Sequence, residues 1–144
     1  MKLRQFSVAL SACSGLLLLP ACKPNPPVTT LAPATINLSM DNNGGCTQTE
    51  ASVQYSDAPV LYGQSASWCA LDASGNKLSV DVKFPAGGSP FSATDFSANA
   101  GSCTQSSGPP LNAMQKTYQY SQVTVNGRQC NPQPDGVVVK PPGT

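Results

Sequence analysis

Cysteine is the most distinctive reactive residue type in this chain, because its 144 residues include six cysteines and no histidine. A cysteine sulfur can act as a nucleophile, bind a metal or close a disulfide. The lack of histidine excludes Ser-His and Cys-His nucleophile pairs, most zinc sites and the usual blue-copper ligand set. The chemistry left to the cysteines is therefore covalent modification, cross-linking or binding of a metal by thiolates alone.

The N-terminal segment has the pattern of an export signal. Lys2 and Arg4 precede an apolar stretch, residues 6–19, which is too short and too interrupted to span a bilayer. The stretch ends in Leu19-Pro20-Ala21-Cys22, which resembles the lipobox of bacterial lipoproteins. The resemblance implies cleavage after Ala21 and attachment of palmitate-type acyl chains to Cys22, which anchor the protein in a membrane. The alternative is a plain secretory signal with a chance cysteine near the cut.

The residues that follow predict where the protein resides. In bacterial lipoproteins, a residue such as Lys23 after the lipidated cysteine implies the outer membrane, with the domain facing the periplasm or the cell surface. Residues 22–34 are rich in proline and predict an extended polyproline II tether or a linker of no set length. We expect residues 1–21 to be the signal peptide, 35–140 a single domain and 141–144 a tail.

The four remaining cysteines predict two disulfides. Cys46, Cys69, Cys103 and Cys130 are an even number in an exported domain. Three pairings are open, and the shorter loop closures favour Cys46–Cys69 with Cys103–Cys130. A thiolate metal site is the alternative, but no Cys-x-x-Cys spacing supports it. We therefore expect no metal and no cofactor.

Apolar residues alternate with polar ones along much of the chain, which predicts β-strands. The clearest strand runs over residues 77–84, and Trp68 lies in another, over residues 65–71, as a core residue rather than a sugar-stacking one. Alternation also predicts strands over residues 35–40 and 51–55, which end at the turns Asp41–Gly45 and Asp57–Pro59, and a further turn is predicted at Asp72–Asn76. Tyr118 and Tyr120 have one parity whereas Val123 and Val125 have the other, which predicts a bulge or a change of covered face near Ser121. Seven or eight short strands without helices predict an all-β, antiparallel sandwich.

Four segments together resemble cupredoxin-like domains: Val60–Trp68, Leu78–Phe84, Thr117–Tyr120 and Gly136–Val139. The resemblance implies a Greek-key β-sandwich, cupredoxin-like or immunoglobulin-like, over residues 35–140. Its copper site does not carry over, because Asn76 and Lys77 stand near the family's first histidine and no Cys-x-x-His follows Tyr120.

The charged residues offer no reactive centre either. They make up 10% of the chain with a net charge of +1, so no basic surface for nucleic acid is expected. The carboxylates beyond the signal lie mostly among Gly, Asn and Pro, where they cap turns rather than form a glycosidase pair or a calcium loop. They are Asp41, Glu50, Asp57, Asp72, Asp81, Asp95 and Asp135.

These observations favour a non-enzymatic, monomeric lipoprotein domain that binds or supports an envelope protein or a glycan. The segments Gly87–Pro90 and Ser106–Pro110 are predicted to be exposed flexible loops and candidate partner surfaces. An alternative is an inhibitor or immunity lipoprotein that neutralises a hydrolase or toxin in the periplasm. A more remote alternative is a redox or copper protein.

Overall fold

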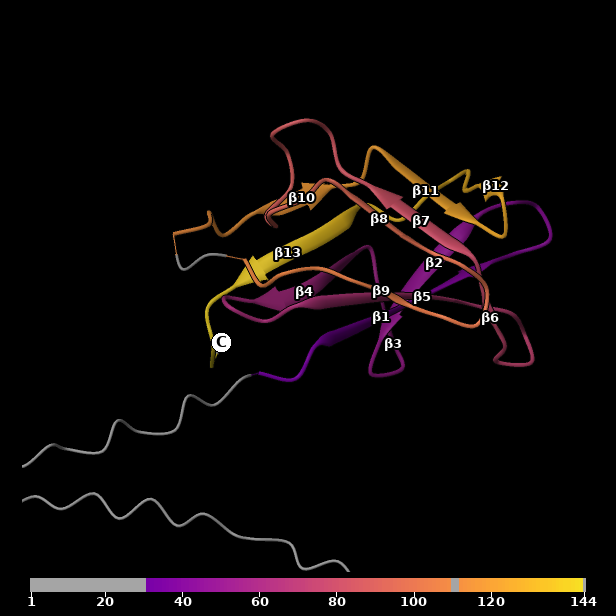
Figure 1. Cartoon of the computed structure of the whole chain (residues 1–144), viewed down its shortest axis with the longest axis horizontal. Coiled ribbons are helices and arrows are strands. Elements are labelled where there is room, and N and C mark those ends of the chain that lie inside the picture. The colour runs from indigo at the N-terminus through magenta and orange to yellow at the C-terminus, as the bar shows by residue number, and fades with distance from the viewer. Residues whose placement is uncertain (1–30, 110–111, 144) are drawn as a thin grey trace, which may run out of the picture.

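Every regular element in the described part of the chain is a β-strand (Figure 1). The computed structural model describes residues 31–109 and 112–143. The strands in order are β1 (Ala34–Met40), β2 (Cys46–Glu50), β3 (Val53–Tyr55), β4 (Asp57–Leu61), β5 (Ala66–Leu71), β6 (Lys77–Leu78), β7 (Val80–Lys83), β8 (Asp95–Ala98), β9 (Thr104–Gln105), β10 (Thr117–Gln119), β11 (Gln122–Val125), β12 (Arg128–Gln129) and β13 (Gly136–Lys140). The all-β prediction is confirmed. Among the described residues there is no helix long and apolar enough to cross a membrane.

The expected count of seven or eight strands is wrong, because the described residues form thirteen strands, several of them only two or three residues long. The predicted strand over residues 51–55 begins later than expected: Ala51 and Ser52 have φ angles of 48° and 67°, and they form the turn of a hairpin between β2 and β3. Asp57–Pro59 was expected to end that strand and instead lies within β4. Short-range composition identified the polar turns but missed this hairpin, whose turn residues are not typical of positive φ.

The largest sheet, sheet A, has the order β3-β2-β1-β5-β6, and β9 also pairs with β5. The central strand β1 is antiparallel to β2 and parallel to β5, with Ala34 opposite Ala66 and Leu38 opposite Ala70. The expectation of a wholly antiparallel fold is therefore wrong for this pair. Both strands begin at one end of the molecule and finish at the other, so the residues that follow them lie at the same end.

Two smaller sheets complete the domain. Sheet B has the order β10-β13-β4, in which β13 and β4 form the second parallel pair. Sheet C has the order β12-β11-β7-β8 and is antiparallel throughout. The chain passes repeatedly from one sheet to another, for example from β10 in sheet B to β11 in sheet C and back to β13 in sheet B.

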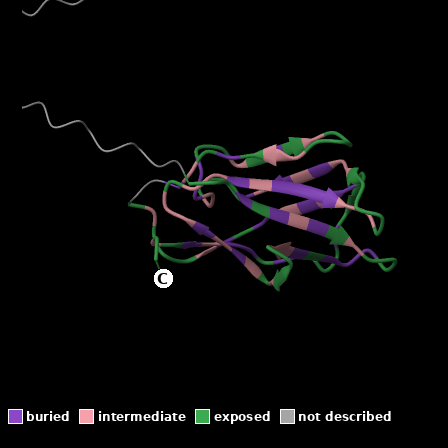
Figure 2. Ribbon diagram, turned by 90° about the horizontal axis from the view of Figure 1, so that it is seen from below, coloured by how far each residue is buried: buried purple, intermediate pink, exposed green. Residues whose placement is uncertain are grey.

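The parity switch noted near Ser121 marks the point where the chain changes sheet. Tyr118 and Tyr120 are buried from the side of sheet B, and Val123 and Val125 are buried from sheet C, where β11 pairs with β7. The predicted change of covered face is confirmed, and its cause is a transfer between sheets. Figure 2 shows the buried residues along the strands and the exposed ones mostly in the turns.

Trp68 lies at the centre of the core, as predicted, and is completely buried. Its ring stacks on Phe96 with centroids 4.9 Å apart and meets Phe91 edge-on at 5.6 Å. Phe84 packs edge-on against both Trp68 and Tyr120. Aromatic pairs of this geometry contribute about 0.5–1.5 kcal/mol each beyond the area they bury. The centre of the core is therefore a cluster of five aromatic rings drawn from distant parts of the chain, and buried aliphatic residues of all three sheets complete it.

A buried polar network connects this aromatic cluster to sheets A and B. The Trp68 indole N–H donates to the Tyr120 hydroxyl at 2.9 Å, and that hydroxyl donates to Gln48 Oε1 at 3.1 Å. Gln48 Nε2 in turn donates to the Ser56 and Gly136 carbonyls, each at 2.8 Å. Burial raises the pKa of Tyr120, so its hydroxyl keeps the proton it donates. Among the described residues no buried side-chain polar atom lacks a partner.

The cysteines pair differently from the expectation. The disulfides are Cys46–Cys130 and Cys69–Cys103, so the predicted pairing of Cys46 with Cys69 and of Cys103 with Cys130 is corrected. Strand pairing decides the outcome: β9 lies against β5 with Thr104 opposite Trp68, which places Cys103 next to Cys69. Loop length alone favoured the wrong partners because it ignores which strands become neighbours.

Candidate binding surface at the far end

We define the two ends of the domain by the position of the start of β1. Residues 31–33 lead into β1 beside the turn that precedes β5, where Gln64 Nε2 donates to the Ala32 carbonyl at 2.9 Å. Lys140, at the end of β13, is opposite Leu61 and lies at this same end. We call this the tether end, on the left in Figure 1. Cys22, the predicted lipidation site, and the predicted signal lie outside the described residues.

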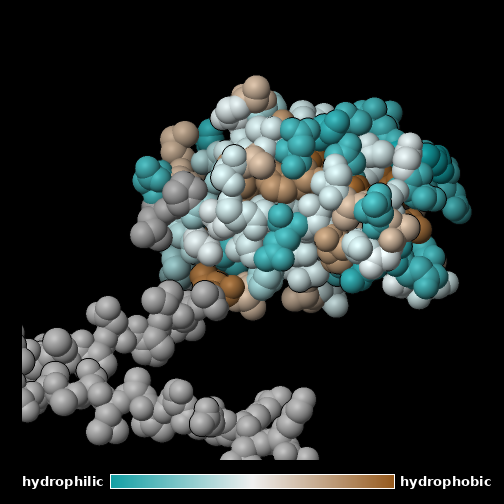
Figure 3. Space-filling model, in the orientation of Figure 1, coloured by the Kyte–Doolittle hydropathy of each residue, from teal (hydrophilic) through white to brown (hydrophobic). Residues whose placement is uncertain are grey.

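The opposite end, which we call the far end, is built from polar turns. These turns follow β1, β5 and β11 and precede β9, and they comprise residues 41–45, 72–76, 126–127 and 99–102. Hydrophilic residues predominate at this end, on the right of Figure 3. The predicted turn at Asp41–Gly44 is confirmed, and so is the one at Asp72–Asn76.

The turns after the parallel strands β1 and β5 are stabilised by the same hydrogen-bonding pattern. In each, an aspartate directly follows the strand, and its Oδ1 accepts the N–H groups two and four residues later. Asp41 accepts from Asn43 and Gly45 at 2.8 and 2.9 Å, and Asp72 accepts from Ser74 and Asn76 at 2.9 and 2.8 Å. The hydrogen bonds from Asn76 and its neighbours lower the pKa of Asp72. These two carboxylates hold loops in shape.

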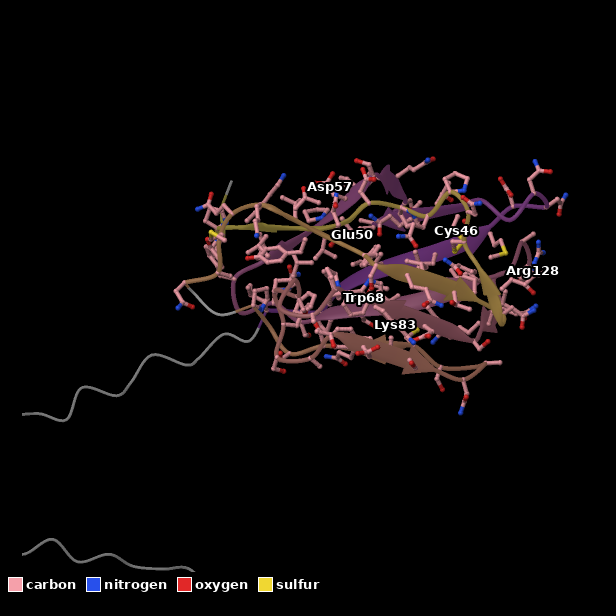
Figure 4. All side chains as sticks on the ribbon, turned by 90° about the horizontal axis from the view of Figure 1, so that it is seen from above. Cys46, Glu50, Asp57, Trp68, Lys83 and Arg128 are labelled. Carbon is pink, nitrogen blue, oxygen red and sulfur yellow. A yellow bond between two sulfur atoms is a disulfide. The ribbon has the colours of Figure 1, made fainter. Side chains whose placement is uncertain are left out.

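The third turn carries a cation. Asn126 and Gly127 have φ angles of 50° and 75°, as a tight hairpin between β11 and β12 requires. Arg128 follows and is exposed, and its guanidinium has no ion pair or hydrogen bond among the described residues. It lies beside Gly44, because a Cβ built there would be 3.5 Å from its Nη2. Figure 4 shows Arg128 near the disulfide of Cys46.

Between these turns is a hollow of about 230 Å³ with a polar rim and an apolar floor. Its floor is Met40, Leu78 and Val125, and its rim is Asp41, Asn42, Asn126 and Arg128. On the other side of β12, a shallow hollow of about 510 Å³ is lined by Ser121, Gln129, Cys130, Asn131 and Gln133. β12 thus presents Arg128 to one hollow and Gln129 to the other.

The disulfide and the backbone fix the position of β12 against the turn after β1. Cys46–Cys130 joins the first residue of β2 to the residue that follows β12. The Cys46 N–H donates to the Pro132 carbonyl and the Asn131 N–H to the Gly44 carbonyl, each at 2.8 Å. The far-end groups are therefore arranged in advance, and a partner would lose less conformational entropy in binding them.

The other predicted site residues are dispersed. Asp57 and Asp81 accept hydrogen bonds from Thr117 and Ser97, and no three potential metal ligands gather among the described residues. Glu50 is at the tether end, where partial burial raises its pKa. Asp95 accepts from Thr94, and Asp135 lies in the segment before β13.

The two loops predicted as partner surfaces are more constrained than expected. Ser106 is buried, with its hydroxyl accepting the Ala66 N–H at 2.9 Å, and Pro109 is fully buried. Gly108 touches the Gly63 backbone so closely that a Cβ would overlap it. The prediction of an exposed flexible loop at residues 106–109 is therefore wrong, and Pro110 lies outside the described residues. Within the other segment, Pro90 is buried while Gly87 is exposed.

Sequence reasoning did not select Asn126 or Arg128. The Asn-Gly pair between Val125 and Arg128 is a strong hairpin signal and could have identified the third turn. Side-chain amides and a guanidinium around an apolar floor can bind peptide carbonyls, carboxylates or sugar hydroxyls. No protein-family model matches the chain, and no curated protein or solved structure does so.

Proposed function

We propose that the chain is a bacterial lipoprotein of the outer membrane whose β-domain is a non-catalytic binding module for an envelope protein or glycan. The observation that carries the binding role is the far end, where cross-linked, hydrogen-bonded turns surround a hollow and hold an unpaired arginine. The membrane role rests on the lipobox residues Leu19–Cys22 and on Lys23. Lipid on Cys22 would hold the domain by the end opposite this surface.

We further infer a Greek-key β-sandwich of the cupredoxin-like or immunoglobulin-like kind. Support comes from the connections between sheets, because the chain enters sheet C at β7, leaves it at β9 and returns at β11. An up-and-down arrangement would keep consecutive strands as neighbours. The parallel pairs β1–β5 and β4–β13 also join strands that are distant along the chain.

In vivo photo-cross-linking tests the binding role. A photoreactive amino acid at Asn126 should trap a partner from intact cells, whereas the same residue at the exposed Gln115, in the segment before β10, should not. Arg128→Ala should reduce the trapped yield several-fold. The matched control Lys116→Ala removes a cation that lies over the Tyr118 ring at the tether end, and it should leave the yield unchanged. Equal trapping from positions 126 and 115, or none from 126, would contradict the proposal.

Two further measurements separate the parts of the proposal. Mass spectrometry of the purified protein should find an acylated cysteine at the mature N-terminus, and Cys22→Ser should remove the lipid while leaving binding in solution intact. If the trapped partner is a hydrolase or toxin whose activity falls on binding, the inhibitor role replaces the structural one.

A further inference from the structure

The exposed large apolar side chains of the described residues lie in the half of the domain nearer the tether end. They are Leu31, Val53 and Met114, exposed by 40%, 51% and 62%. Leu31 lies three residues before the start of β1. Met114 adjoins Ala113, whose carbonyl accepts the Tyr62 hydroxyl at 3.0 Å in the turn after β4. Val53 is opposite Glu50, which is in register with Ile36 near the start of β1.

Amphipathic residues line a groove in the same half of the domain. A groove of about 370 Å³ between the β2–β3 hairpin and β4 is lined by Glu50, Tyr55, Pro59, Leu61, Gln64 and Lys140. Tyr55 and Tyr62 are half-buried rings with polar tips, and Lys140 is an exposed cation. A hydrophobic patch shows in Figure 3 at the lower left, where the described chain begins. Tyrosine, lysine and isolated aliphatic side chains together are typical of surfaces that meet lipid headgroups.

The edge beside this groove is poorly suited to a peptide strand. The backbone N–H of Tyr62 donates to the Lys140 carbonyl in the β13 ladder, so the N–H of Leu61 points to the open side of β4. That N–H already donates to Gln64 Oε1 at 3.0 Å, and Pro59, two residues earlier, has no N–H to offer. Edge strands with few free donors are poor templates for the addition of another strand. The apolar side chains here are therefore better matched to an occupant that needs no backbone pairing.

We propose that the tether end is a bilayer-contact surface, on which Leu31, Val53 and Met114 touch the lipid interface and Lys140 meets headgroup phosphates. The location supports a bilayer as the occupant, because a lipid on Cys22 would hold this end of the domain nearest to the membrane. Three side chains bind lipid weakly by themselves, but an anchor supplies a high local concentration of bilayer. This inference goes beyond the proposed binding role and draws on its lipid anchor.

The methionines offer a direct test, because Met114 is at the tether end and Met40 lines the far-end hollow. The full chain, purified in its membrane form with ¹³C-methyl methionine, would be reconstituted in phosphatidylethanolamine–phosphatidylglycerol vesicles containing nitroxide-labelled lipid. We expect paramagnetic broadening of the Met114 methyl signal several-fold above that of Met40. Equal broadening of both signals, or no broadening at Met114, would overturn the proposal that the tether end contacts the bilayer.

Variants sharpen the test. Val53→Asp should reduce the broadening at Met114 several-fold, and the matched far-end substitution Ala73→Asp, also at an exposed position, should not. If mass spectrometry finds no lipid on Cys22, the anchor fails and vesicles would be added to the soluble chain. Broadening of Met114 but not Met40 then still supports the surface, whereas no broadening refutes it. Thermal unfolding of each variant would verify that it is folded.

Discussion

The two ends of this domain are built on different principles. At the far end, polar turns are held by aspartate caps and by the Cys46–Cys130 disulfide around an exposed arginine. At the tether end, the groove is bordered by Tyr55 and Lys140, which make no cross-link, and exposed apolar side chains lie nearby. A surface whose groups are held in place before binding suits selective recognition of one partner. A surface of mixed polar and apolar side chains without cross-links suits a partner that has no fixed shape.

Removing the disulfides should have the largest effect on this contrast. The chain-entropy relation gives about 4.5 kcal/mol for a bridge that spans 84 residues and about 3.8 kcal/mol for one that spans 34. We therefore expect Cys46→Ser/Cys130→Ser to lower the free energy of unfolding more than Cys69→Ser/Cys103→Ser. Chemical denaturation would measure both, and hydrogen exchange should show the first variant loosening the far end selectively. An equal loss of hydrogen-exchange protection at both ends would contradict the expected difference between them.

Tyr120→Phe is expected to have the next largest effect on stability, because it removes the buried hydroxyl that joins Trp68 to Gln48 in the core between the two ends. The Trp68 indole N–H and Gln48 Oε1 would lose their partner inside the core. A buried polar group left unsatisfied costs about 1–3 kcal/mol. Denaturation followed by Trp68 fluorescence would measure the change. Tyr62→Phe, which loses a hydrogen bond in a half-buried setting, is the matched control and should cost less.

Glu50→Gln should have a smaller effect on stability and should raise it rather than lower it. Partial burial raises the pKa of Glu50 above its ordinary value of 4.5, so its charged form is less favourable in the folded state. Above that raised pKa the native carboxylate lowers stability, and this penalty disappears as the pH falls through it. The variant should therefore unfold at a slightly higher temperature than the parent at neutral pH and at the same temperature in acid. A lower unfolding temperature at neutral pH would contradict the assignment.

Asp72→Asn should show the smallest effect and the reverse direction. Hydrogen bonds from Asn76 and its neighbours hold the pKa of Asp72 below its ordinary value of 3.8, so the folded state favours the carboxylate. That contribution is present above the unfolded pKa and disappears as the pH falls through the folded one. The variant should be slightly less stable near neutral pH and equal to the parent in strong acid. Calorimetry from neutral pH to strong acid would measure both pH dependences, that of Glu50 at the tether end and that of Asp72 at the far end.

Local sequence pattern predicted several of the strands and turns correctly. Alternation identified β1, β5 and β7, and Gly, Asn and Asp identified the turns at Asp41 and Asp72. Both signals work because side-chain period and turn geometry depend on neighbouring residues. The burial of Trp68 followed from the same reasoning.

Most of what escaped prediction depends on contacts between distant residues, and the local hairpins at Ala51–Ser52 and Asn126–Gly127 are the exceptions. The parallel pairing of β1 with β5, and the β5–β9 pairing that joins Cys69 to Cys103, cannot be read from local alternation. The far-end hollow was missed for the same reason, since Met40, Leu78 and Arg128 come from three separate segments. The lipid on Cys22 and the cell compartment remain predictions.

The central position of β1 has a mechanical consequence. The chain enters the domain at Ala34, and β1 is hydrogen-bonded along its length to β2 on one side and to β5 on the other. A pulling force on the N-terminal segment, with the far end held by a partner, acts along the strand axis and loads both ladders in shear. Because all these bonds must then break together rather than one after another, the domain should resist extension strongly.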